Sequence, residues 1–375
     1  MKVKCGYKSV NGDYVFSFVA KKVQEYKKIT GNEVIDLGVG DVKFPPPKSI
    51  CEAIKEESKK FCLPEFFCGY PDECGILSLR EKISEYYKQF GANVSEDEIF
   101  ITTGAKPALG ELFEVCDFKN AGIVLPTYPL YEELCALHGT QVEFIYSNSE
   151  NFFPLPRKKV DALFICSPNN PAGHTLSEKN LKEIINYTKN QNALAVIDGA
   201  YADFTQEYIC PYKFSDSENI VEVRSYSKNL CFTGLRCGYV VIKKQNPLHG
   251  AYKKYLSLRS NGVNVIMQRT AILSYTQECR QEVLKRANYY RQNAKILEKV
   301  LQNKNLTYSG GVNVPYLLVN VGKCGQEFFE DLLNNCGVVV TPGEAFHANN
   351  CVRISCLAHR KQIEHGAKIL KEFLK

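Results

Sequence analysis

The segment ALFICSPNNPAG, residues 162–173, decides the fold class of this chain. Its first five residues are apolar, and the seven that follow are rich in the turn-forming residues Ser, Pro, Asn and Gly. A short apolar run that ends at turn residues is typical of a parallel strand covered by helices on both faces. The run LAVID at 194–198 repeats the pattern, and Leu181, Ile184 and Ile185 recur at helical spacing between the two runs. This alternation of strand and helix predicts an α/β domain with a largely parallel sheet.

Further strand-like runs extend this pattern along the chain at IFITT (99–103), GIVL (122–125), VEFIY (142–146), IVEV (220–223) and YVVI (239–242). The pattern changes near residue 245, where a long, mostly helical stretch begins and runs to about residue 303. Three shorter strands are predicted after it, at VPYLLVN (314–320), GVVVT (337–341) and CVRIS (351–355). Strands and helices mixed in this way predict a second, smaller α+β domain.

We therefore expect three parts in the chain. Residues 1–46 form an N-terminal arm and part of the small domain, because they precede the first strand-helix unit. Residues 47–274 form the large α/β domain. Residues 275–375 form the C-terminal small α+β domain.

Composition excludes several classes of protein. The 375 residues carry a net charge of +6 without a basic run, which argues against nucleic acid as a partner. With 45% hydrophobic and 23% charged residues, the chain has the composition of a folded globular protein. We find no run of 18 apolar residues and no signal peptide, so we expect a cytoplasmic protein that does not contact membranes. The 16 cysteines include no C-x-x-C pair, which favours reduced thiols over disulfides or a metal site.

Polar residues that could carry chemistry follow several of the predicted strands. Thr103-Gly104-Ala105-Lys106 opens a helix, so its backbone N–H groups either cradle a phosphate or form an ordinary turn. Ser225, Lys228 and Arg236 follow another strand and suit a bound phosphate with an amine beside it, although a plain polar loop would have the same composition.

Asp198 ends an apolar strand, where its carboxylate needs a cationic partner unless it caps a helix. Open α/β sheets bind ligands at this end of their strands. The turn residues 167–173 need no function of their own. Arg353 alternates with Val352 and Ile354 in a strand, so it either binds a carboxylate or points to solvent.

The order of these signals is more specific than any one of them. With Asn170, Asp198, Lys228 and Arg236 in sequence, the chain resembles the fold type I pyridoxal-phosphate (PLP) aminotransferases of class I/II over nearly its whole length. The family's Asn-Pro-Thr-Gly motif is present from Asn170 with Ala in place of Thr. The resemblance implies a large domain with a mostly parallel mixed sheet flanked by helices, plus a smaller α+β domain.

The resemblance also assigns roles to individual residues. Lys228 would bind PLP covalently and then act as the base, Asp198 would pair with the pyridine nitrogen, and Tyr128 would stack on the ring. The remaining groups would contact the phosphate, the phenolic oxygen or the substrate. The phosphate ligands would be Ser225, Arg236 and the backbone at Ala105 and Lys106; the phenolic oxygen would meet Asn170 and Tyr201; and Arg353 would grip the substrate's α-carboxylate, with Gly40 and Asn170 nearby.

Within the family, several stretches look most like LL-diaminopimelate aminotransferase. They are Gly12-Asp13-Tyr14-Val15-Phe16, Leu37 to Asp41, Gly69 to Gly75, Thr103 to Lys106, Arg224 to Lys228 and Phe232 to Tyr239. In that subfamily the segment matching Gly69 to Gly75 comes from the partner subunit. Tyr70 would then reach the neighbour's phosphate, Glu73 the distal ammonium group of the substrate, and Asn261 would be a further partner-supplied group. The resemblance therefore implies a homodimer with composite active sites.

The implied reaction is transamination between LL-2,6-diaminopimelate and 2-oxoglutarate, which gives tetrahydrodipicolinate and glutamate. Val42-Lys43-Phe44 departs from the subfamily's usual Thr-Thr-Glu/Gln near the substrate mouth. That departure leaves open a broad or different amino-acid specificity, or a PLP-dependent β-eliminating lyase. A third alternative is a binding module without catalysis, which the presence of Lys228, Asp198 and Arg353 argues against.

Overall fold

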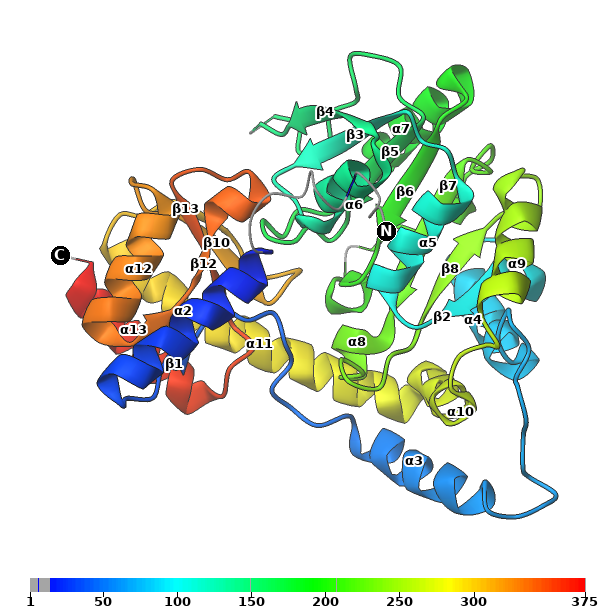
Figure 1. The fold of residues 1–375 in the computed structure, drawn as a ribbon, viewed down its shortest axis with the longest axis horizontal. Coiled ribbons are helices and arrows are strands. Elements are labelled where there is room, and N and C mark those ends of the chain that lie inside the picture. Colours follow the sequence, from blue (N-terminus) through cyan, green and yellow to red (C-terminus); the bar gives the residue numbers. More distant parts are fainter. Residues whose placement is uncertain (1–5, 7–13, 149, 207, 375) are drawn as a thin grey trace, which may run out of the picture.

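A seven-stranded sheet and a four-stranded sheet form the centres of two bodies that lie side by side (Figure 1). The structure is a computed structural model that describes residues 6, 14–148, 150–206 and 208–374. Gly12 and Asp13 of the subfamily motif lie outside the described residues. Among the described residues, no helix is both long enough and apolar enough to cross a membrane.

The larger sheet has the strand order β2-β8-β7-β6-β5-β3-β4. Its strands are β2 (Ile99–Thr102), β3 (Asn120–Leu125), β4 (Gln141–Tyr146), β5 (Ala162–Cys166), β6 (Leu194–Asp198), β7 (Ile220–Ser225) and β8 (Gly238–Ile242). All neighbouring strands from β7 to β4 are parallel, whereas β8 is antiparallel to both of its neighbours. The predicted mostly parallel mixed sheet is confirmed.

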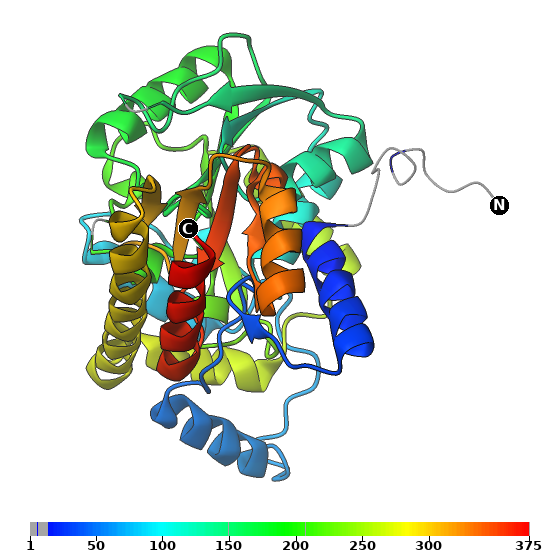
Figure 2. The ribbon, with the colours of Figure 1, turned by 90° about the vertical axis from the view of Figure 1, so that its left-hand side faces the viewer.

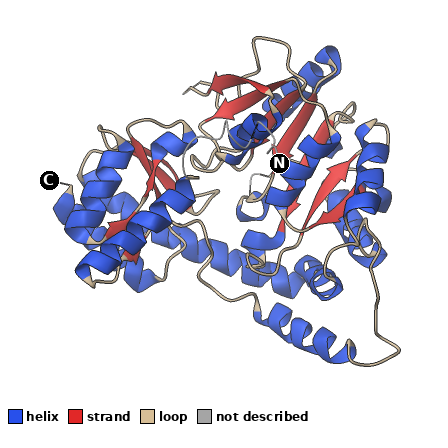
Figure 3. Cartoon of the chain, in the orientation of Figure 1, coloured by secondary structure: helices blue, strands red, loops and turns tan. Residues whose placement is uncertain are grey.

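Side-chain alternation along β5 shows why these runs are apolar throughout. Leu163 and Ile165 face one helical layer, while Ala162, Phe164 and Cys166 face the other. Both faces are therefore buried, which removes the polar alternation of a half-exposed strand. The helices that cover the first face are α4 (Leu77–Lys88), α7 (Glu178–Gln191) and α10 (Val265–Ala271), and those that cover the second are α5 (Ala105–Val115), α6 (Leu130–His138) and α9 (Leu248–Arg259). Figure 3 shows the strands between these helices.

The smaller body contains an antiparallel sheet in the order β12-β13-β10-β9. Its strands are β9 (Tyr308–Gly310), β10 (Tyr316–Asn320), β12 (Thr341–Pro342) and β13 (Cys351–Ser355). The prediction of one strand over 337–341 is wrong, because this run forms two short strands in different sheets. β11 (Val338–Val339) pairs in parallel with β1 (Ile35–Asp36), and β12 joins β13.

Four helices stand in a row on the smaller sheet (Figure 2). They are α2 (Val15–Thr30), α11 (Gln277–Asn303), α12 (Gly325–Cys336) and α13 (Arg360–Phe373). Val19 of α2 packs into the same core as residues of the other three helices. The division of the chain at residues 46 and 274 stays a prediction, and it assigns α2 to the body in which Val19 is buried.

The long helix α11 connects the two bodies. Cys279 near its start lies in the core of the larger body, and Leu297 and Leu301 near its end lie in the core of the smaller one. Its 27 residues correspond to about 40 Å of helix. A continuous helix holds the two sheets at one spacing, which matters because the candidate site draws residues from both.

The helix α3 (Lys48–Lys60) lies at the edge of the molecule, beyond α10 (Figure 1). Ile50 anchors it in the large core, and Glu57 pairs with Arg269 of α10 at 3.2 Å. The loop that follows exposes large apolar side chains, with Phe67 65% exposed and Tyr70 83% exposed. The short elements not yet given are α8 (Tyr226–Asn229) and the 3-10 turns Glu96–Glu98, Ala202–Phe204, Pro211–Lys213, Ile272–Tyr275 and Gly343–Phe346.

We predict that Phe164→Ala lowers the free energy of unfolding by about 3–5 kcal/mol, because it opens a cavity in the middle of the larger sheet. Phe164 is fully buried and stacks on Phe113 and Tyr131 at 5.3 and 5.7 Å between ring centroids. Urea unfolding followed by circular dichroism measures the change. Ile29→Ala is the control, since Ile29 is 83% exposed and should change stability by less than about 0.5 kcal/mol. Equal changes for both variants would contradict the assigned core.

Candidate active site

A cavity of about 510 Å³ opens where strands β5, β6 and β7 end, beside the start of α5 and the inner face of the smaller sheet. Parallel strands present their carboxyl ends at one edge, which is where α/β sheets bind ligands. The cavity brings together eleven of the fourteen predicted site residues. They are Gly40, Ala105, Lys106, Tyr128, Asn170, Asp198, Tyr201, Ser225, Lys228, Arg236 and Arg353.

Asp198 supplies a buried carboxylate at the end of β6. Its Oδ2 accepts a hydrogen bond from the Tyr131 hydroxyl at 2.8 Å, and its Oδ1 accepts one from the Ala200 backbone N–H at 3.0 Å. Burial raises the pKa of the Asp198 carboxyl, while these two hydrogen bonds act in the opposite direction. A cationic ligand group in the cavity would offset the same desolvation.

One end of the cavity gathers donors suited to a phosphate. Arg236 donates from Nη1 to the Ser227 hydroxyl at 3.2 Å and to the Thr233 carbonyl at 3.1 Å. Its Nη2 lies so close to Gly104 that a Cβ at that glycine would come within 2.5 Å, and Gly104 has a φ of +106°. Gly104 immediately precedes α5, so the helix can present its first N–H groups toward the guanidinium. Arginine, hydroxyls and a helix N-terminus together favour an anion.

Lys228 lies in the short helix α8, directly after β7. Its Nζ donates a hydrogen bond to the Gly40 carbonyl and lies 6.0 Å from the centre of the Tyr201 ring. The Tyr201 hydroxyl is 2.7 Å from the Tyr316 hydroxyl, which is 3.4 Å from the same Gly40 carbonyl. A lysine amine and a tyrosine hydroxyl are thereby fixed on one wall of the cavity.

Arg353 is the most deeply buried charged group of the site, with 1% of its surface exposed. Its guanidinium donates to Asn170 Oδ1 at 3.1 Å and to the Gly38 carbonyl at 2.9 Å, and it lies over the Tyr316 ring at 4.4 Å. Its Nε has no hydrogen-bond partner, and none of the described carboxylates forms an ion pair with it. The sequence left open whether Arg353 points to solvent; in the structure it faces the cavity. A buried arginine without an acidic partner is suited to a carboxylate ligand.

Three predicted residues lie outside this cavity. Tyr70, Glu73 and Asn261 belong to two exposed segments that pack against each other, since a Cβ on Gly262 would come within 2.7 Å of Pro71. The two segments that carry these residues are therefore neighbours, and none of the three lines the cavity that contains Lys228.

Sequence reasoning missed two tyrosines that support the site, Tyr316 in the cavity wall and Tyr131 behind it. Tyr131 and Tyr316 were not predicted, although their hydroxyls hold Asp198 and Tyr201. Both lie in apolar runs where a tyrosine is an ordinary core residue. Tyr131 also contacts the Tyr128 ring edge-on, 6.1 Å between centroids. The spacing of Tyr128 and Tyr131, three residues apart at the start of a helix, was the signal that could have found it.

Comparison with known proteins decides the family. Residues 32–370 match the family "Aminotransferase class I and II". The chain belongs to the class I and II aminotransferases. This confirms the resemblance and favours an enzyme over the binding module without catalysis.

Two relatives and one solved structure that this chain resembles are LL-diaminopimelate aminotransferases. This aminotransferase is 32% identical to the LL-diaminopimelate aminotransferases of Bacteroides fragilis, with 97% of both chains covered, and of Desulfotalea psychrophila, with 98% covered. Its structure matches that of L,L-diaminopimelate aminotransferase from Chlamydomonas reinhardtii with a TM-score of 0.92. The two chains are 27% identical, and the match covers 100% of this chain and 99% of the other.

We predict that the cofactor-free aminotransferase loses stability relative to its Asp198→Asn variant as the pH rises above 3.8, the usual carboxyl pKa. A raised pKa means that the folded state binds more protons than the unfolded state between the two pKa values, so the free energy of unfolding falls with increasing pH there. Below pH 3.8 both states are protonated and the difference levels off. Urea unfolding at a series of pH values measures the difference in free energy of unfolding between the two proteins. The Asn side chain does not titrate, so a difference independent of pH would contradict the raised pKa.

Proposed function

We propose that this aminotransferase uses PLP to transfer an amino group from LL-2,6-diaminopimelate to 2-oxoglutarate, giving tetrahydrodipicolinate and glutamate. One observation carries the proposal: a single cavity contains a lysine, a buried aspartate and a buried arginine that lacks an acidic partner. The substrate assignment is supported by the relatives named above, which match along nearly the whole chain.

The residues present fit PLP. Arg236, Ser225, Ser227 and the start of α5 would hold its phosphate, and Asp198 would face the ring nitrogen from the opposite end. Tyr128 would cover one face of the ring, while Asn170 and Tyr201 would contact the phenolic oxygen. Asn170 accepts from Arg353 through Oδ1, so its Nδ2 is the atom that can donate to this oxygen. Gly104 supports the fit, because a side chain there would displace Arg236.

When bound, PLP withdraws electrons from the Cα of an amino acid attached to it, which acidifies the Cα proton. Asp198 would keep the ring nitrogen positively charged by supplying the ionised carboxylate. Lys228 Nζ would remove the proton from the substrate's Cα. It would then deliver this proton to the carbon bonded to the other side of the substrate nitrogen. The Gly40 carbonyl fixes this amine on the cavity wall before it acts. Arg353 would bind the α-carboxylate through two parallel hydrogen bonds and so orient Cα toward Lys228.

The proposal includes a homodimer with composite active sites. Tyr70, Glu73 and Asn261 do not line the cavity of their own chain, and Phe66 and Phe67 near them in the sequence are 45% and 65% exposed. A second subunit would cover these apolar side chains and receive the three polar groups at its own cavity. A cytoplasmic location is also part of the proposal, since the fifteen described cysteines are free thiols.

The alternatives of a broad specificity and of a β-eliminating lyase arose from Val42-Lys43-Phe44. Gly40 and Asp41 line the cavity, but Val42 and Phe44 do not. Val42 packs in a core with Tyr290, and Phe44 contacts the Tyr290 ring at 5.9 Å between centroids. Val42 and Phe44 thus change packing outside the cavity, and the exposed Lys43 does not line it either, which favours the LL-diaminopimelate assignment over both alternatives.

We expect Lys228→Ala to abolish transamination, because no other described lysine shares the cavity except Lys106 at the phosphate end. The variant should also lose covalently bound PLP, measured by intact mass after borohydride reduction. Two assays separate transamination from elimination. Transamination forms an oxo acid from LL-diaminopimelate, whereas elimination releases a thiol and ammonia from a sulfur amino acid. Unchanged turnover would remove Lys228 from the mechanism.

We expect Glu73→Gln to weaken the reaction with LL-diaminopimelate far more than that with glutamate. The distal ammonium group would lose a charge-assisted partner, at a cost of about 1.5–3 kcal/mol in kcat/KM. Steady-state kinetics with both amino donors measures the difference, and Asp72→Asn is the matched control, as its carboxylate is a neighbour that was not assigned to substrate. Equal effects on both donors would take Glu73 out of the distal site.

A further inference from the structure

Asn229, the residue after Lys228, is tied to a carboxylate behind the active site. Its side chain is 7% exposed, and its Nδ2 donates to Asp203 Oδ2 at 2.7 Å. Its Oδ1 is already occupied, since it accepts the backbone N–H of Leu230 at 2.8 Å. The orientation of this amide is therefore fixed, with oxygen toward the backbone of α8 and nitrogen toward Asp203.

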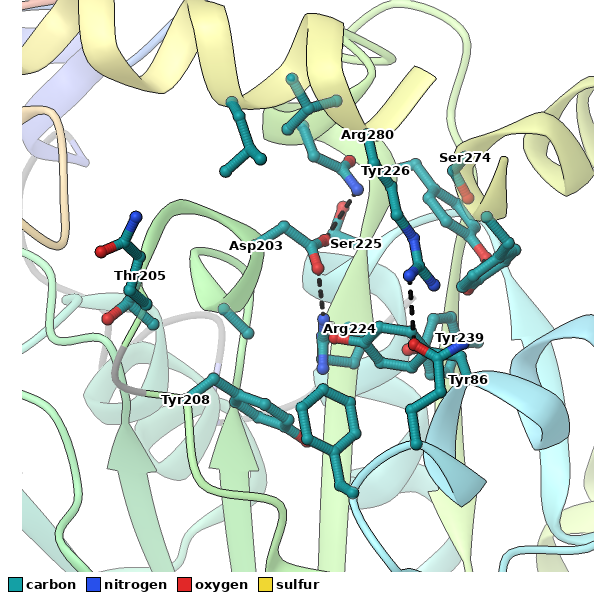
Figure 4. A pocket seen from close by; sticks show the side chains of 18 residues that line it. Tyr86, Asp203, Thr205, Tyr208, Arg224, Ser225, Tyr226, Tyr239, Ser274 and Arg280 are labelled. Carbon is teal, nitrogen blue, oxygen red and sulfur yellow. Dashed lines mark hydrogen bonds and ion pairs between the residues drawn. The ribbon is translucent and has the colours of Figure 1, made fainter. Parts of the chain in front are cut away.

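Asp203 is itself held from the other side by a buried arginine (Figure 4). Its Oδ1 accepts from Arg224 Nη2 at 2.8 Å, and Arg224 has only 3% of its side chain exposed. The other nitrogen of Arg224 donates to Glu222 at 3.3 Å, and the Glu222 carboxylate also accepts from the hydroxyls of Tyr87 and Tyr208 at 2.6 and 2.9 Å. A buried network of this kind has few alternative arrangements. It gives Asp203 a rigid support.

Asp203 lies in one segment of the chain that carries residues of the active site and close to a second. The segment 198–204 carries Asp198 and Tyr201, while the segment 225–229 carries Ser225 and Lys228. The Asp203 carboxylate adds a side-chain link to the pairing of β6 with β7, since one of its oxygens accepts from Arg224, just before the second segment, and the other accepts from Asn229 within it. Asp203 lines a cavity of about 250 Å³. Figure 4 shows Arg224 and Ser225 beside Asp203.

We propose that Asp203 is a positioning residue that acts through Asn229 to set the place of Lys228 relative to Asp198 and Tyr201. Asp203 touches neither substrate nor cofactor in this assignment, so its effect passes through α8. The inference rests on the proposed role of Lys228. A displacement of about 1 Å in a reacting group can lower the rate about a hundredfold. The hydrogen bond from Asn229 to Asp203, which fixes the turn that carries Lys228, should therefore affect kcat.

The experiment exchanges the two side chains. In Asp203→Asn the introduced NH₂ group would face a donor in either amide orientation, Asn229 Nδ2 or Arg224 Nη2, and in Asn229→Asp two carboxylates would face each other. In the double variant the amide introduced at position 203 can accept a hydrogen bond from Arg224 and donate one to the carboxylate introduced at position 229. That carboxylate can still accept the backbone N–H of Leu230. Each single variant should lower kcat by roughly ten- to a hundredfold with little change in KM, since Arg353 still binds substrate. The double variant should recover most of the loss.

Two further measurements separate positioning from stability and from the proposed function. The rate at which PLP becomes covalently attached, followed by borohydride reduction and mass, should fall in both single variants and recover in the double variant. Arg280→Gln is the control, because Arg280 lines the same cavity but donates to Gln89 at 3.1 Å and lies over the Tyr86 ring, and it should leave kcat and attachment unchanged. A double variant no better than the worse single one, or single variants that lose thermal stability with unchanged kcat, would overturn the inference. Failure of the wild-type protein to attach PLP at Lys228 would instead overturn the proposed function.

Discussion

Asp198 and Arg353 are two buried groups of opposite charge that face one cavity and do not pair with each other. Asp198 is 4% exposed and Arg353 1% exposed, and each is held by neutral hydrogen-bonding groups. Two isolated charges in a protein interior are expensive to desolvate, and direct contact between them would offset much of that cost. Because the two groups stay apart, the cavity attracts a cation at Asp198 and a carboxylate at Arg353.

This separation depends on the arrangement of the two bodies. Asp198 ends a strand of the larger sheet, and Arg353 lies within β13 of the smaller one. The hydrogen bond from Arg353 to Asn170, which follows β5, crosses between them at 3.1 Å. The helix α11 has its two ends in the two cores and sets their spacing over a longer distance. A change in the packing of either sheet against α11 therefore alters the distance between the charges, even where no residue of the cavity is changed.

Much of this architecture could be predicted from the sequence, because burial on both faces of the larger sheet produces continuous apolar runs with turn residues at their ends. The same logic placed Asn170 and Asp198 at one edge. It failed for residues 337–341, where Val338 and Val339 pair with β1 in one sheet and Thr341 pairs with β13 in another. It also failed for Tyr316, since a tyrosine in an apolar strand gives no sign that its hydroxyl supports another polar group, and for Tyr131, whose spacing from Tyr128 was the one available signal.

These supporting contacts explain how the cavity is organised before anything binds. Five of its polar side chains are each held by a neighbouring residue: Asp198 by Tyr131, Tyr201 by Tyr316, Asn170 by Arg353, Lys228 by Gly40 and Arg236 by Ser227. Their orientations are fixed in the folded chain, so little reorganisation is needed when charge develops in the cavity. Groups fixed in this way serve the part of the chemistry that all substrates share. In the proposed function, discrimination among amino acids would come instead from groups outside this supported set, such as Glu73 in the segment that exposes Tyr70.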